Sequence, residues 1–152
     1  MNRASVDRPA EILLIEDNQG DVRLAQEMLS ETRITNHVHV VGDGEQALLF
    51  LRGEKPFLSA PRPDMILLDL NLPRVGGQEV LTEIRLDPRL QRIPVVVLTT
   101  STSEADIEEA ARQRCQRYLN KPGDLTEFTE IVKSIQELLT SIMGQSPSGT
   151  YE

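Results

Sequence analysis

Four short apolar runs in this sequence are each followed by side chains that can do chemistry. The first run ends in Glu16 and Asp17, and the second ends in Asp69. The third leads into Thr99, and the fourth is followed closely by Lys121. Carboxylates bind hard cations, whereas a hydroxyl and an ammonium group can bind a phosphoryl oxygen. These five residues are therefore the candidate functional site.

The apolar runs are predicted to be buried strands of a parallel sheet, because each is short, is bounded by turn residues and alternates with a helical pattern. Together with an alternating, valine-rich segment, they give predicted strands at residues 11–16, 37–41, 64–69, 93–99 and 116–119. The repeated strand–helix order predicts a five-stranded, doubly wound α/β fold with a parallel sheet and five helices. Ligands bind such sheets at the carboxyl ends of the strands, so the candidate residues are expected to meet at one edge.

Side chains suited to helix capping mark the starts of several predicted helices, among them Asp43 and Ser103. Helices are predicted to start near residues 18–21, 43, 78, 103 and 125. The helix after Asp43 is expected to face Ala47, Leu48 and Leu51 inward. The bond before Pro122 is a candidate for the cis form.

Length, composition and charge narrow the class of protein. The 152 residues predict one domain at residues 10–143, between a flexible segment, 1–9, and a disordered tail, 144–152. The formal net charge of −8 argues against direct nucleic-acid binding. No segment matches a membrane span or a secretory signal, and Cys115 is a single cysteine, which together predict a cytoplasmic protein.

Glu16, Asp17 and Asp69 are expected to lie close together at the ends of adjacent strands. Two unit charges about 4 Å apart repel by roughly 1–4 kcal/mol, so such a cluster needs a cation or shifted pKa values. Carboxylates, carbonyls and waters are ligands for Mg²⁺ or Ca²⁺ rather than for zinc. We expect Mg²⁺ held by Asp17, Asp69 and the Asn71 carbonyl, with Glu16 acting through a metal-bound water. The alternative is that these acids cap helices or face solvent.

Asp69 is the best candidate nucleophile, because it ends the strand with the most buried pattern. A carboxylate nucleophile, a hard cation, the Lys121 ammonium and the Thr99 hydroxyl are the parts needed for phosphoryl transfer. Taken singly, Lys121 could be a solvated lysine and Thr99 an ordinary β-branched strand residue.

Glu16-Asp17, Asp69, Thr99 and Lys121-Pro122, in this order, resemble the receiver domain of two-component response regulators over residues 11–142. The resemblance implies a flavodoxin-like fold in which Asp69 accepts a phosphoryl group from a histidine kinase. It also implies that Lys121 contacts the phosphoryl group and that Thr99 turns toward it. Tyr118, at the family's switch position, would move inward in step.

Residues 16–24, the proline-containing loop 52–63 and residues 68–73 resemble the regulators associated with phytochrome-type sensor kinases. That resemblance implies a kinase of this type as the partner. The chain departs from the family pattern in three places: Thr100 is larger than usual, Arg114-Cys115 replaces Gly-Ala, and Gly123 replaces a bulky residue.

The favoured interpretation is a stand-alone phospho-acceptor switch rather than an enzyme. A homodimer through the helix after Ser103, strand 116–119 and the last helix is expected, whether constitutive or driven by phosphorylation. Leu138, Leu139 and Ile142 either extend that contact or pack on their own domain. A phosphorelay intermediate that passes phosphate to a histidine phosphotransfer protein is the alternative.

Two enzyme or binding classes fit the sequence less well. An aspartyl phosphatase needs a general acid two residues after its nucleophile, where this chain has Asn71. A nucleotide-binding domain needs a glycine-rich phosphate loop after the first strand, where residues 18–21 have a single glycine and carry the acid Asp21.

Overall fold

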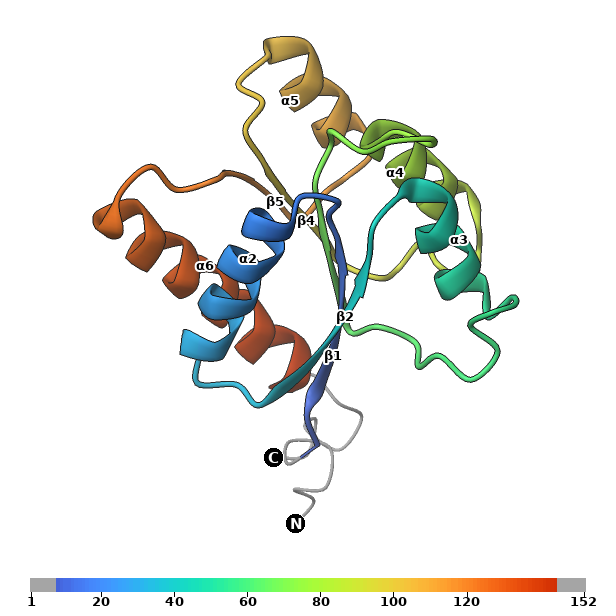
Figure 1. The fold of residues 1–152 in the computed structure, drawn as a ribbon, viewed down its shortest axis with the longest axis horizontal. Coiled ribbons are helices and arrows are strands. Elements are labelled where there is room, and N and C mark those ends of the chain that lie inside the picture. The colour runs from blue at the N-terminus through green and yellow to red at the C-terminus, as the bar shows by residue number, and fades with distance from the viewer. Residues whose placement is uncertain (1–7, 145–152) are drawn as a thin grey trace.

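The computed structural model describes residues 8–144 and shows one sheet with helices on both faces (Figure 1). The strands are β1 (Ala10–Ile15), β2 (Asn36–Val41), β3 (Met65–Leu68), β4 (Val95–Thr99) and β5 (Arg117–Asn120). They pair in parallel in the order β2-β1-β3-β4-β5. The predicted five-stranded parallel fold is therefore confirmed, and no strand end differs from its predicted position by more than two residues.

Five helices cover the two faces of the sheet. They are α2 (Gln19–Glu31), α3 (Gly44–Arg52), α4 (Gly77–Leu86), α5 (Glu104–Arg112) and α6 (Leu125–Gly144). Helices α2 and α6 lie on one face, and α3, α4 and α5 lie on the other (Figure 1). Two separate hydrophobic cores result, one on each side of the sheet.

The alternation of side chains along the strands divides the apolar residues between the two cores. Leu13 and Ile15 face the core under α3 and α4, whereas Ile12 and Leu14 face the core under α2 and α6. Strand β3 lies in the middle of the sheet, and all four of its residues are buried. A continuous apolar run is what a strand covered on both faces requires.

The capping residues act as the sequence predicts. The Asp43 carboxylate accepts a hydrogen bond from the Gln46 N–H at 2.7 Å, and the Ser103 hydroxyl accepts one from the Asp106 N–H at 3.2 Å. Asn18 caps α2 in the same way, accepting from the Asp21 N–H at 2.9 Å. These bonds satisfy donors at the helix starts that have no partner within the helix.

Three expectations differ from the structure. In α3 the buried large residue is Phe50, and the predicted inward-facing Leu48 and Leu51 are only partly buried at the edge of the core. Among residues 8–144 the one cis peptide bond is Lys55–Pro56, so the bond before Pro122 is trans. Helix α6 extends through Gly144, the first residue of the predicted tail.

The ends of the chain were predicted to be flexible, and residues 1–7 and 145–152 lie outside the described part. Arg8 is described, and its guanidinium donates to the Asp64 carboxylate at 2.7 and 2.9 Å. Burial alone would raise the pKa of Asp64, but the bonds from Arg8 and from the Glu11 N–H lower it below its usual value. The start of the domain is therefore fixed by an ion pair.

Leu138 and Leu139 pack inside the core beneath α2 and α6, and Ile142 packs against that core. Of the two alternatives for these residues, packing on their own domain is the observed one. Within residues 8–144 no helix has both the length and the apolar content to cross a membrane.

Gly77, the first residue of α4, allows the start of this helix to approach the backbone at the end of β3. A Cβ on Gly77 would lie 2.4 Å from the Leu70 Cα and 2.6 Å from the Asp69 carbonyl oxygen. The Gly77 N–H donates to the Leu70 carbonyl at 3.1 Å. A side chain here would push α4 away from the residue that follows β3.

We predict that Gly77→Ala destabilises the fold by about 2 kcal/mol or more, because the new methyl group would meet backbone that cannot rotate away. Gly42→Ala is the matched control, since a Cβ on Gly42 would have nothing within 4 Å. Urea denaturation of the two variants measures the difference. Equal stability of the two variants would contradict the close approach at Gly77.

Candidate functional site

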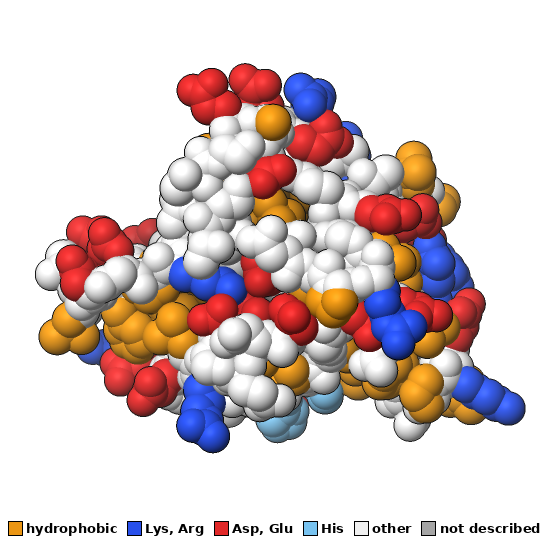
Figure 2. Space-filling model, turned by 45° about the horizontal axis from the view of Figure 1, so that its top comes forward, with side chains coloured by type: hydrophobic (Ala, Val, Ile, Leu, Met, Phe, Trp, Pro, Cys, Tyr) orange, Lys and Arg blue, Asp and Glu red, His pale blue; other side chains and the backbone are white. Residues whose placement is uncertain are grey.

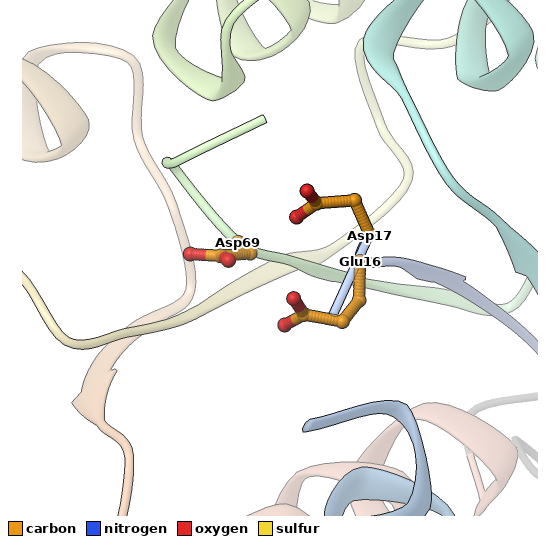
Figure 3. Close-up of side chains that lie close together, drawn as sticks. All are labelled: Glu16, Asp17 and Asp69. Carbon is orange, nitrogen blue, oxygen red and sulfur yellow. The ribbon is translucent and has the colours of Figure 1, made fainter. Parts of the chain in front are cut away.

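The carboxyl ends of β1 and β3 bring the three candidate carboxylates together. These strands are neighbours with Ile15 opposite Leu68, so Glu16 and Asp69 leave the sheet side by side. The three side chains, including Asp17, point toward a common space (Figure 3). One carboxylate oxygen from each residue lies within 4.8 Å of the others. The predicted convergence of the acids is what the structure shows.

The three acids differ in burial. Glu16 is 4% exposed and Asp69 is 5% exposed, whereas Asp17 is exposed to solvent. Burial raises the pKa of Glu16 above its usual value, and the nearby Asp69 carboxylate raises it further, against the opposing effect of Lys121. Two carboxylates in a poorly solvated place need positive charge beside them.

Lys121 supplies that positive charge. Its Nζ lies 2.9 Å from Glu16 Oε1 and 3.2 Å from Asp69 Oδ2, and its side chain is 10% exposed. Burial would lower the pKa of Lys121, but the bonds to Asp21 and Glu16 raise it above its ordinary value. The Lys121 N–H donates to the Thr99 carbonyl at 2.9 Å, which fixes where the lysine leaves the sheet.

Asp21 is a member of this cluster that the sequence analysis did not single out. Its Oδ2 lies 2.8 Å from Lys121 Nζ, the shortest of the three contacts of that ammonium group. Asp21 stands in the first turn of α2, three residues after the Asn18 cap, where an acid is usual at a helix start. The sequence does indicate where Asp21 lies, because the helix that carries it starts shortly after Asp17, at the same edge of the sheet.

The cluster carries excess negative charge. Four carboxylates, those of Glu16, Asp17, Asp21 and Asp69, face one ammonium group. Figure 2 looks toward this edge and shows acidic side chains gathered near the middle of the face, beside a basic one. The converging oxygen donors are the ligand chemistry of Mg²⁺, Mn²⁺ or Ca²⁺, so the residues present fit a hard divalent cation.

Asn71 is tied to Asp69 through the backbone. The Asn71 N–H donates to Asp69 Oδ1 at 3.2 Å, on the side of the carboxylate away from the Lys121 contact at Oδ2. Both oxygens of Asp69 therefore have a donor, and the orientation of the carboxylate is fixed. The loop that carries Asn71 is the one that Gly77 allows to pack closely.

Thr99 ends β4 between β3 and β5 and is fully buried. Its hydroxyl accepts a hydrogen bond from the Ser101 N–H at 3.3 Å. The Ser101 carbonyl in turn accepts from the Tyr118 hydroxyl at 3.0 Å and from the Asn120 amide at 2.8 Å. Thr99 and Tyr118 are thus joined through one residue, Ser101.

Tyr118 lies on β5 and packs against the core under α3, α4 and α5. Burial raises the pKa of its hydroxyl above the usual value. Cys115 is partly buried against the same core, and burial raises the pKa of its thiol. A thiol with a raised pKa is a poor nucleophile, so Cys115 is no candidate for the chemistry of this site.

We predict that the contact between Lys121 and Asp21 contributes about 1 kcal/mol to stability, because a charged hydrogen bond forms at a poorly exposed ammonium group. A double-mutant cycle with Lys121→Met and Asp21→Asn, followed by urea denaturation in metal-free buffer, measures this coupling. The matched cycle pairs Lys121→Met with Glu27→Gln, which removes an exposed acid from the same helix. Equal coupling in both cycles would show that Asp21 acts only through the overall charge.

Comparison with known proteins agrees with this geometry. Residues 12–133 match the family model described as the response regulator receiver domain. The chain is 43% identical over 128 residues to the response regulator Rcp1 of Synechocystis sp., covering 84% of this chain and 87% of that protein. It is 42% identical over 130 residues to the probable methanogenesis regulatory protein FilR2 of Methanothrix harundinacea, covering 85% and 83% of the two chains.

Solved structures give the same result. The crystal structure of the phosphorylated cyanobacterial phytochrome response regulator RcpA aligns with a TM-score of 0.81 and 46% identity, covering 88% of this chain and 96% of that one. The Mn²⁺-bound form of Rcp1 aligns with a TM-score of 0.77 and 40% identity, covering 91% and 97%. Together with the acids and the lysine at the strand ends, these matches establish that the chain belongs to the response regulator receiver domain family.

Proposed function

We propose that this chain is a phospho-acceptor regulator in which Asp69 takes a phosphoryl group from a histidine kinase in a reaction that requires Mg²⁺. The observation that carries the proposal is the environment of Asp69. Its carboxylate is buried, fixed by Asn71 and Lys121, and lies within 4.8 Å of two further acids. A fixed carboxylate beside a cation site is suited to in-line attack on phosphorus.

In the proposed step, a carboxylate oxygen of Asp69 attacks the phosphorus of a phosphohistidine. The new P–O bond forms as the P–N bond breaks, and the electron pair leaves with the imidazole, which takes a proton. Asp17, Asp69 and the Asn71 carbonyl would hold Mg²⁺, with Glu16 acting through a water. The cation would neutralise negative charge on the phosphoryl oxygens.

In this proposal Lys121 also binds the transferred phosphoryl group. Its ammonium group now bonds Asp69 Oδ2 and two further acids. After transfer, a phosphoryl oxygen on Asp69 offers a more highly charged acceptor close to the same Nζ, and Lys121 contacts it. Asp21 and Glu16 keep the ammonium group at the site in both states.

The proposed switch uses the contacts of Ser101. If the Thr99 hydroxyl turns to donate to a phosphoryl oxygen, it gives up its bond from the Ser101 N–H. Tyr118 moves inward as its bond to the Ser101 carbonyl is released. Phosphorylation would then bias an equilibrium between two arrangements of the segment after β4.

The partner we propose is a phytochrome-type sensor kinase. The RcpA structure, at 46% identity, is that of a phytochrome response regulator, which supports this assignment. FilR2 is almost as similar in sequence as Rcp1 and is named for methanogenesis, which keeps a different kinase and a phosphorelay role as alternatives. The homodimer through α5, β5 and α6 stays a prediction, because Leu138 and Leu139 pack within their own domain.

With Mg²⁺ and acetyl phosphate, we expect the protein to gain one phosphoryl group, and Asp69→Asn to abolish the gain because an amide is not a nucleophile. Intact-protein mass spectrometry measures the added phosphoryl group. Asp124→Asn is the control, since the Asp124 side chain lies outside the acidic cluster and accepts the Glu127 N–H at the start of α6. Labelling of Asp69→Asn at the wild-type rate would show that the nucleophile is another residue.

We expect Asp17→Asn to weaken Mg²⁺ binding by about tenfold or more, because one of the three converging carboxylates is lost. Calorimetric titration with Mg²⁺, and separately with Mn²⁺, measures the affinity. Asp21→Asn removes the same charge from a partner of Lys121 that is not one of the three converging acids, and is expected to have a much smaller effect. If both variants weaken binding equally, Asp17 acts through the field of the cluster and is not a ligand.

A further inference from the structure

A polar cavity lies at the opposite end of the sheet from the acids. It has a volume of about 450 Å³ and is bounded by the segments that lead into β4 and β5 and by the end of α4. Arg85, Arg92 and Arg114 line it, together with two glutamines and the Ile93–Pro94 segment. This size is within the range of small-molecule sites.

Arg85 forms the fixed wall of this cavity. Its guanidinium donates to the carbonyls of Gln113 at 2.6 Å, Gln91 at 2.9 Å, Arg114 at 3.2 Å and Ile93 at 3.3 Å. These carbonyls would otherwise present negative partial charge beside the ends of α4 and α5. Arg85 therefore ties two loops together and removes the groups that would repel an anion.

Unlike Arg85, the side chains of Arg92 and Arg114 do not donate to backbone carbonyls of the described residues. Within residues 8–144 neither side chain has a hydrogen bond or an ion pair, and no acid lines the cavity. The chain has 24 acidic and 16 basic residues, so three arginines together without an acid are contrary to its overall charge. Burial lowers the pKa of the Arg85 guanidinium, and the positive charge of nearby Arg114 lowers it further.

The backbone at Arg114 is a second, independent observation. Arg114 follows α5 with φ of 60°, in the left-handed region, and its N–H donates to the Ala111 carbonyl at 2.9 Å. Glycine is the favoured residue at this position after a helix, because a side chain there is strained. Among the described residues, no hydrogen bond or ion pair of the Arg114 side chain accounts for an arginine at this turn.

We propose that this cavity binds a small phosphate-bearing anion through the guanidinium groups of Arg92 and Arg114. A guanidinium fork matches two oxygens of a phosphate group, and two forks facing one cavity suit a ligand with more than one anionic group. The amides of Gln91 and Gln116 line the same cavity and supply further hydrogen-bonding groups. The site is independent of Asp69 and of the proposed function.

Inorganic pyrophosphate is the probe, titrated by calorimetry into the full chain in buffer free of divalent cations. Without a cation the acidic cluster repels anions, so binding there does not interfere. Saturable binding of one pyrophosphate per chain, with a raised Tm, is expected. No saturable binding, or citrate binding as tightly as pyrophosphate, would overturn the proposal of a phosphate site.

Arg114→Gly and Arg92→Gln are each expected to weaken pyrophosphate binding by about tenfold or more. Arg114→Gly places the favoured residue at the left-handed position, so its Tm without ligand should equal or exceed that of the wild type, which separates loss of binding from loss of fold. Arg23→Gln, which removes an exposed arginine from α2, is the matched control and should leave binding unchanged. Equal losses in all three variants would mean that only overall charge matters, and would overturn the proposal.

Discussion

The structure depends on one electrostatic constraint. The parallel sheet of this protein brings several carboxylates to one edge, and their negative charge must be balanced there. Glu16 and Asp69 are buried side by side because β1 and β3 pair in register. The ammonium group of Lys121 bonds both of them and also Asp21, so elements far apart in the sequence meet at one nitrogen atom. One ammonium group does not neutralise four carboxylates, and the remaining negative charge makes the site chemically suited to a divalent ion. The cost of assembling the cluster and its capacity to bind a metal therefore have the same origin.

Backbone packing fixes the position of this chemistry. Strand β3 is buried on both faces, so the end of the strand cannot shift toward either core. The loop after it is then held by the approach of Gly77 to the Asp69 carbonyl and by the Asn71 N–H on the Asp69 side chain. An aspartate on an ordinary surface loop would have neither constraint. Because the Asp69 carboxylate follows the most buried strand, its orientation is fixed by the whole fold rather than by the loop alone.

Much of this arrangement could be predicted from the sequence, because strand ends and helix caps are local signals. The acids after β1 and β3 and the Asp43 and Ser103 caps lie where the patterns place them. The role of Asp21 could not be predicted in the same way, because its partner Lys121 is a hundred residues away and an acid at a helix start already has a local explanation. In α3, spacing alone did not distinguish Phe50 from Leu48 and Leu51, since the tilt of the helix on the sheet decides which side chain is buried. Local patterns thus locate groups along the chain, whereas the choice between equivalent faces needs the tertiary packing.

Ser101 shows how a small change at the acidic edge can reach the surface. Its N–H bonds the Thr99 hydroxyl, its carbonyl accepts from Tyr118 and Asn120, and its own hydroxyl donates to Asp106 of α5 at 2.6 Å. In the proposed switch, a rotation of the Thr99 hydroxyl toward Asp69 would remove one bond from Ser101, which also bonds residues of β5 and α5. Each of these bonds contributes only about 1 kcal/mol net, so the proposed exchange between two arrangements would not require the buried strands to move. Coupling of this kind needs no deformation of the core, because Ser101 bonds both the Thr99 hydroxyl and the Tyr118 hydroxyl.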